Sequence, residues 1–266
     1  MAIVKAFKGI RPIEELASKI AALPYDVMSS EEARDMAIDN PYSFLHIDRA
    51  EIDLDPSVDI HDKKVYEKAR ENLDKMIEDG QFIQDEKPCL YIYRQIMNGR
   101  SQTGLVFCAS IDDYLNNVIK KHEYTRADKE LDRINHVDYC DANTGPIFLT
   151  YREDEVTSEV IKEWTKEGTK RKPVYDFISE DGIGHQVWVI DNEIIVEEII
   201  ALFKEIENLY IADGHHRSAS AVKVGLKRRE ENPDYTGEEE FNYFLAVAFP
   251  DNDLTVSYTH LTLPTN

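Results

Sequence analysis

The stretch YIADGHHRSASA, residues 210–221, places two histidines and an arginine directly after an Asp-Gly turn. Residues 210–212 are typical of the end of a buried strand, and Gly214 can adopt the positive φ of a tight turn. From His216 onward, apolar residues recur at helical spacing. The first N–H groups of a helix have no intrahelical acceptor, and the helix dipole favours a negative charge beside them. The motif therefore predicts an anion site at a strand–turn–helix junction.

The side chains of the DGHHR motif are of the types that bind phosphate. Phosphoryl transfer requires positive groups and N–H donors around the moving phosphate, and a base for the acceptor hydroxyl. The candidate phosphate-binding residues of the motif are Gly214, Arg217 and Ser218. The candidate catalytic residues are His215 and His216. Asp213 can hold a magnesium ion through oxygen, or it can simply cap the turn while one histidine packs in the helix.

A second dense group of polar residues is KKHEYTRADKELDRINH, residues 120–136. His122 and Glu123 directly follow the apolar stretch YLNNVI, and strand ends often display catalytic groups. We expect Glu123 or His122 to accept a proton, and Arg126 and Arg133 to bind phosphate. A solvated helix with charge pairs explains the same segment without function. The spacing is not that of the zinc motif H-E-x-x-H, because Arg126 stands where the second histidine would be.

The two groups are predicted to form one pocket. Each places histidine, carboxylate and arginine just after an apolar strand, which is a costly arrangement unless the charges meet a partner. We expect Glu123 and Arg217 to face a common cavity. In the segment PYDV, the proline ends the preceding helix, which puts Tyr25 and Asp26 on a connection. We expect both to lie on the rim of the pocket; alternatively, Tyr25 is buried and Asp26 caps the next helix.

The composition narrows the class of protein. The 266 residues carry 52 acidic and 31 basic side chains, a formal net charge of −21, which repels nucleic acid backbones. The three cysteines have no C-x-x-C spacing and indicate reduced thiols in a cytosolic protein. The N-terminus lacks a signal-peptide apolar region, and the apolar run near residue 194 is interrupted by two glutamates. We expect a cytoplasmic protein that binds neither nucleic acid nor membrane.

Hydrophobic patterns and turn residues predict an α+β fold with mixed sheets, hairpins and flanking helices. The expected strands cover residues 2–10, 42–47, 89–96, 102–110, 146–152, 174–190 as a hairpin, and 243–249. The expected helices cover residues 12–22, 30–38, 65–77, a segment around 164, and 193–206. The expected domain organisation is an α/β region over 1–100, a core region with both motifs over 101–256, and a tail over 257–266.

Four ordered motifs, PYDV, HEYTRADKELDR, NTGPIFLTY and YIADGHHRSASA, resemble the bacterial domain-of-unknown-function family 1015, from residue 3 to about residue 254. The segment DGHHR is also similar to the ParB/sulfiredoxin superfamily. That resemblance implies a strand–turn–helix core whose Gly-x-x-Arg turn binds nucleotide phosphates, and the superfamily includes free serine kinases. Sulfiredoxins have a catalytic cysteine where this chain has His215, so their cysteine chemistry is not implied.

We therefore expect the protein to bind a nucleotide (ATP or ADP) with Mg²⁺, or a phosphorylated small metabolite. The expected reaction is phosphoryl transfer of the serine-kinase type. One alternative is a non-catalytic ParB-like nucleotide-binding module, which the acidic composition disfavours. Another is a metal-dependent hydrolase or phosphatase. Its ligands would come from His122, His136, Asp213, His215 and His216.

The last ten residues, SYTHLTLPTN, depart from the pattern of the family. They resemble a sequencing-adapter read-through, whereas family members continue with a strand and an Asn-Arg-containing segment. We expect a truncated family member whose foreign tail, residues 257–266, makes few native contacts.

Overall fold

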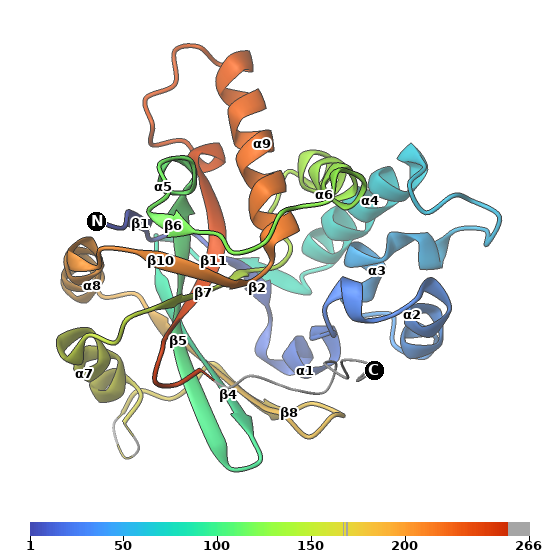
Figure 1. Ribbon diagram of the computed structural model, residues 1–266. Helices are drawn as coiled ribbons and strands as arrows, with labels where there is room; N and C mark the ends of the chain where they lie inside the picture. The colour runs from blue at the N-terminus through green and yellow to red at the C-terminus, as the bar shows by residue number, and fades with distance from the viewer. Residues whose placement is uncertain (167, 169, 255–266) are drawn as a thin grey trace, which may run out of the picture.

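A computed structural model describes residues 1–254, apart from 167 and 169. In this part of the chain, nine strands form one mixed sheet in the order β6-β10-β7-β11-β5-β4-β9-β8, with β1 beside β5. In Figure 1, α7 and α8 lie on the left of the sheet, and α2, α3, α4 and α6 lie on the right. The predicted α+β class with mixed sheets, hairpins and flanking helices is confirmed.

The strands of the large sheet are β1 (Val4–Lys5), β4 (Leu90–Met97), β5 (Arg100–Ser110), β6 (Ile119–Lys120), β7 (Ile147–Tyr151), β8 (Tyr175–Ile178), β9 (Gly184–Ile190), β10 (Leu209–Asp213) and β11 (Tyr243–Pro250). A separate two-stranded sheet contains β2 (Ile10–Pro12) and β3 (Phe82–Gln84). The α-helices are α1 (Ala17–Ile20), α2 (Ser30–Ala37), α3 (Leu45–Asp48), α4 (Lys63–Glu78), α5 (Ile111–Leu115), α6 (Ala127–Cys140), α7 (Glu155–Trp164), α8 (Glu193–Glu205) and α9 (His215–Glu231). The 3₁₀ turns are η1 (Glu14–Leu16), η2 (Tyr25–Val27), η3 (Ala50–Asp53) and η4 (Glu240–Asn242).

Local sequence signals locate several of these elements. Asn98 and Gly99 both have positive φ, 53° and 78°, as a two-residue turn between antiparallel strands requires, so the predicted β4–β5 hairpin is confirmed. Ser29 and Glu32 form the predicted capping box of α2. Gly80 follows α4 with a φ of 72°, as predicted for its C′ residue.

The core is divided among separate hydrophobic clusters. In the main cluster, Phe203 of α8 is fully buried against the rings of Phe107 and Tyr151, with centroid distances of 5.3 and 5.4 Å. A second cluster joins the apolar face of α4 to Ile47, and a third joins α2 to Leu45. The N-terminal helices therefore have a core of their own beside the large sheet.

The predicted strand over residues 42–47 is wrong, because residues 45–48 form the helix α3. Leu45 packs in the third cluster and Ile47 in the second, while Phe44 and His46 are half-buried. Residues two apart on a helix point about 200° apart. A short helix held between two cores thus buries alternate residues and imitates the strand period.

The N-terminal segment also differs from its prediction. The strand expected over residues 2–10 is divided into β1 and β2, with an isolated bridge between Phe7 and Cys89. Pro12 does not open a helix: it is the last residue of β2 and pairs with Phe82. The chain changes sheets here, and this tertiary event has no local signal.

The predicted division at residue 100 falls at the β4–β5 hairpin, whose strands pair in one sheet, and the domain division stays a prediction. The predicted tail, residues 257–266, lies outside the described residues. Among the residues that the structure describes, no helix combines the length and apolar character needed to span a bilayer.

We expect Phe203→Ala to lower the free energy of unfolding by about 3–5 kcal/mol, because it leaves a cavity beneath two aromatic rings. Ile194→Ala is the control in the same helix, since Ile194 is 75% exposed, and its effect should stay within about 0.5 kcal/mol. Urea unfolding measures both. Equal losses in the two variants would contradict this packing.

Candidate functional site

Three neighbouring strands bring the predicted site segments together at one end of the strands. β10 runs parallel to β6, with Leu209 opposite Ile119, so the residues that follow the two strands leave at the same end. β7 is antiparallel to β10 and therefore begins where β10 ends, with Phe148 opposite Asp213. The segments HEYTRA, NTGP and GHHR consequently meet there.

Gly214 forms the predicted turn between β10 and α9. Its φ of 91° lies in the left-handed region, which favours glycine. The N–H group of Ser218 donates to the carbonyl of Gly214 over 2.9 Å, which closes the first turn of α9. Gly214 has no side chain to cap the helix, and no side-chain cap is present. The first turn of this 17-residue helix therefore offers N–H donors and the positive end of its dipole.

Arg217 is fixed beside that first turn. Its guanidinium donates from Nη2 to Asp213 over 2.6 Å and from Nη1 to the Pro146 carbonyl over 2.8 Å. A Cβ atom at Gly214 or Gly145 would lie 3.3 Å from guanidinium nitrogens. The two glycines thus leave the space in which the guanidinium lies, and the side chain links the DGHHR and NTGPI motifs.

His122, Glu123 and His215 form a cluster at the same junction. The rings of His122 and His215 meet edge to face at a centroid distance of 4.4 Å, and a carboxylate oxygen of Glu123 lies 3.9 Å from Nδ1 of His215. Burial lowers the pKa of His215, and the neighbouring His122 lowers it further. His215 is 6% exposed, and its buried Nε2 has no hydrogen-bond partner among the described residues. A buried nitrogen without a partner is costly, which makes this ring a candidate functional group.

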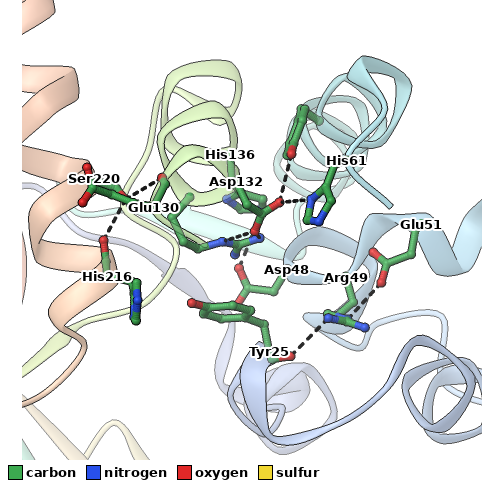
Figure 2. A network of polar contacts seen from close by, with 12 residues as sticks. Tyr25, Asp48, Arg49, Glu51, His61, Glu130, Asp132, His136, His216 and Ser220 are labelled. Atoms are coloured by element: carbon green, nitrogen blue, oxygen red, sulfur yellow. Dashed lines mark hydrogen bonds and ion pairs between the residues drawn. The ribbon is translucent and has the colours of Figure 1, made fainter. Parts of the chain in front are cut away.

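The loop that carries Glu123 is held against α9. The backbone N–H of Arg126 donates to Nε2 of His216 over 3.1 Å, and the hydroxyl of Thr125 donates to Glu130 over 2.6 Å. Ser220 donates in turn to the carbonyl of Glu130 over 3.0 Å; Figure 2 shows Glu130, His216 and Ser220 together. The two predicted groups therefore lie side by side.

Other predicted residues are engaged differently. The exposed side chain of Arg126 pairs with Asp128 over 2.7 Å. Ser218 is fully buried, and its hydroxyl donates to the carbonyl of His215 over 3.0 Å. His136 is buried, and its Nε2–H donates to the carbonyl of Ile47 over 3.0 Å.

Arg133 of α6 lies in a buried network. Its guanidinium pairs with Asp132 over 2.7 Å and lies 4.0 Å from the centroid of the Tyr25 ring. Burial opposes its charge, but Asp132, Tyr25 and Asp48 outweigh burial and raise the pKa of Arg133. Figure 2 shows Asp132 between His61 and the centre of this network. Arg133 is thus a fixed, charged wall residue.

A cavity of about 180 Å³ joins this network to Arg217. Its polar lining comes from Tyr25, Asp48, Arg133, His136, Asn143, Thr144 and Arg217. PYDV, the α3 segment, α6, NTGPI and DGHHR all contribute to it, so five segments share one cavity. Tyr25 lines it, whereas Asp26 is exposed and is not part of the lining. The predicted place of both residues on the rim of the His215 site stays a prediction.

Neither Asp48 nor Thr144 was among the residues predicted for the site. The hydroxyl of Thr144 donates to Asp48 over 2.7 Å, and Nε2 of His136 lies 3.9 Å from the same carboxylate. Asp48 is the last residue of α3 and directly follows the segment whose structure was wrongly predicted. Thr144 stands in the NTGPI motif, and that motif was the available signal.

The metal-ligand set expected for a hydrolase is not assembled in the described residues. They contain no group of three or more histidine, cysteine, aspartate or glutamate side chains placed to hold a metal ion.

The chain matches the model of a known protein family over a range that includes all four motifs. The model of a family described as "Protein of unknown function (DUF1015)" matches residues 4–263. The chain belongs to the DUF1015 family. No curated protein and no solved structure matches this chain. The DUF1015 match extends beyond residue 257, into the segment predicted to be foreign.

The lowered pKa of His215 predicts a pH dependence of stability. Between that lowered value and the usual 6.5, the unfolded chain binds a proton that the folded protein does not. The contribution of His215 to the free energy of unfolding is therefore lost as the pH falls below about 6.5. His215→Gln should reduce the loss measured by urea unfolding between about pH 7.5 and about pH 5.5.

His61→Gln is the control for this experiment, because the side chain of His61 is 60% exposed. An unchanged pH dependence in His215→Gln would show that the ring is not buried as a neutral base.

Proposed function

We propose that this DUF1015 protein binds the phosphate groups of a nucleotide or phosphorylated metabolite at the start of α9 and transfers a phosphoryl group to a small-molecule hydroxyl. The observation that carries the proposal is the uncapped first turn of α9 beside the fixed guanidinium of Arg217. Next to it, the buried Nε2 of His215 has no partner among the described residues. An anion site and proton-transfer groups therefore adjoin.

Phosphate oxygens would accept hydrogen bonds from the first N–H groups of α9 and from Arg217. Asp213 partly neutralises Arg217, so a second positive charge would strengthen binding. Mg²⁺ suits this position, since it commonly binds one or two carboxylates together with substrate phosphates. The side chain of Asp213 is 66% exposed and accessible to such an ion. A bound Mg²⁺ would neutralise charge on the phosphates.

Glu123 is the proposed base. As the acceptor oxygen bonds to phosphorus, Glu123 takes the hydroxyl proton, and the phosphorus–oxygen bond to the leaving group breaks with its electron pair. The neutral ring of His215 lies 3.9 Å from Glu123 and can donate or accept a hydrogen bond there. Glu123 is 63% exposed, which leaves room for a substrate to approach.

A cytoplasmic location suits this proposal, because nucleotides and metabolites are abundant there. Three buried, free cysteines support it, since thiols persist in reducing compartments. The net charge of −21 supports a small phosphorylated ligand over a nucleic acid, whose many charges would be repelled.

Arg217→Gln should weaken phosphate binding roughly tenfold to a hundredfold, because it removes a charged donor from the site. Thermal-shift and calorimetric titrations with ATP, ADP, pyrophosphate and phosphate, each with and without Mg²⁺, measure this loss. Arg152→Gln is the matched control: Arg152 follows the opposite end of β7 and its side chain is 87% exposed. Equal affinities in both variants, or no binding by the parent protein, would reject the anion site.

Glu123→Gln should preserve binding of the same phosphate ligands and lower turnover roughly 10²–10⁴-fold, because the amide cannot accept the proton. Release of labelled phosphate or transfer to an acceptor measures turnover. Glu193→Gln, on the exposed start of α8, is the control. Binding without turnover in the parent protein would support a nucleotide-binding module instead.

A further inference from the structure

The cavity beside Arg217 contains polar groups for which the proposed phosphate site has no use. Arg217 lines both the first turn of α9 and the cavity, so the two sites are contiguous. Asp48, Thr144 and Arg133 also line the cavity. Their side chains form a second set of recognition groups next to the phosphate site.

Asp48 is the acceptor in this set. Its side chain is 15% exposed, and it accepts the hydroxyl hydrogen of Thr144. Burial lowers the pKa of the adjacent His136, and the charge of Arg133 lowers it further, so this ring gives Asp48 no positive charge near neutral pH. Arg133 acts on Asp48 electrostatically, but its direct partner is Asp132. Asp48 therefore keeps acceptor capacity and negative charge towards the cavity.

The charge balance indicates what the cavity would bind. Arg133 pairs with Asp132 and Arg217 pairs with Asp213, whereas no arginine or lysine of the described residues forms an ion pair with Asp48. One negative charge is left uncompensated, and a buried charge of this kind is costly without a partner. A ligand donor at Asp48 would supply the partner, and an ammonium would also balance the charge. The guanidinium N–H groups that line the same cavity favour a ligand that carries a carboxylate.

The walls also limit the size of the ligand. A single water requires about 10–15 Å³ of such space, so about 180 Å³ holds a molecule of several non-hydrogen atoms. Phe44, Val137 and Ile147 supply apolar surface for a short carbon chain. A long or highly charged molecule would fit neither the space nor the charges.

We propose that this cavity binds a small carboxylic acid that carries an amino or hydroxyl group. The carboxylate lies against Arg133 and Arg217, and the ammonium or hydroxyl donates to Asp48. The proposal rests on the proposed function in one respect: an acid with a further hydroxyl beyond the group bound to Asp48, such as L-serine or glycerate, is the acceptor, and its place beside Arg217 brings it next to the phosphate site.

Calorimetry and thermal shift on the full chain test this binding with glycine, L-serine, glycolate and glycerate as probes. Acetate and ethanolamine are the controls, since each has only one of the two groups. We expect probes with both groups to raise the melting temperature and the controls to have little effect. A preference for amino acids over the matching hydroxy acids assigns an ammonium to Asp48, and the reverse preference assigns a hydroxyl. Stabilisation by none of the four probes overturns the proposal.

Asp48→Asn should weaken the binding of these probes roughly tenfold or more, because it removes the acceptor charge. Thr144→Val keeps that charge and removes one hydrogen bond, so a smaller loss is expected. Asp26→Asn is the control for an exposed aspartate outside the cavity. Unchanged probe binding in Asp48→Asn, or equal losses in all three variants, overturns the assignment.

Pyrophosphate binding by Asp48→Asn separates this proposal from the proposed function. Retained pyrophosphate binding shows a folded protein with an intact phosphate site, so a loss of acid binding then supports the cavity assignment. If the parent protein binds the acids but no phosphate ligand, the cavity proposal stands as a binding site and the proposed phosphoryl transfer fails.

Discussion

The packing of α6 against α9 is the interaction on which the candidate site depends. Residues 218–221 of α9 are small and buried, and the hydroxyl of Ser220 reaches the backbone carbonyl of Glu130. At the other end of the contact, Lys227 pairs with Asp138 over 2.6 Å. Because α6 follows the HEYTRA loop and α9 begins at the DGHHR turn, their contact brings both motifs together. The same helix α6 carries Arg133 to the cavity.

Arg217 connects the chemistry on the two sides of this contact. Its guanidinium is oriented by Asp213 and the Pro146 carbonyl, so little conformational freedom would be lost when a ligand binds. It adjoins Gly214 at the start of α9 and also lines the cavity. The two guanidinium groups of the cavity, of Arg133 and Arg217, both have carboxylate partners. Such a site is compatible with a strongly acidic protein. It also favours ligands that carry both a positive and a negative charge.

The sequence by itself determined the features that depend on neighbouring residues. The α2 capping box, the Asn98-Gly99 hairpin and the strand–turn–helix junction at Gly214 were all predictable, because backbone preference and adjacent hydrogen bonds decide them. The meeting of the Glu123 and His215 segments was predictable from their position after strands. Their exact partners were not, since strand order across the sheet places them.

Only the tertiary structure decided which charges are buried and which are exposed. Arg133 has the same sequence signature as Arg126, yet Tyr25 and Asp132 enclose the first while the second remains exposed. The period-two pattern around Asp48 indicated a strand, but two separate cores bury the alternate residues of a helix. Long-range packing decides how deeply each side chain is buried, and burial decides how much free energy its charge costs. Neither can be read from the neighbouring residues in the sequence.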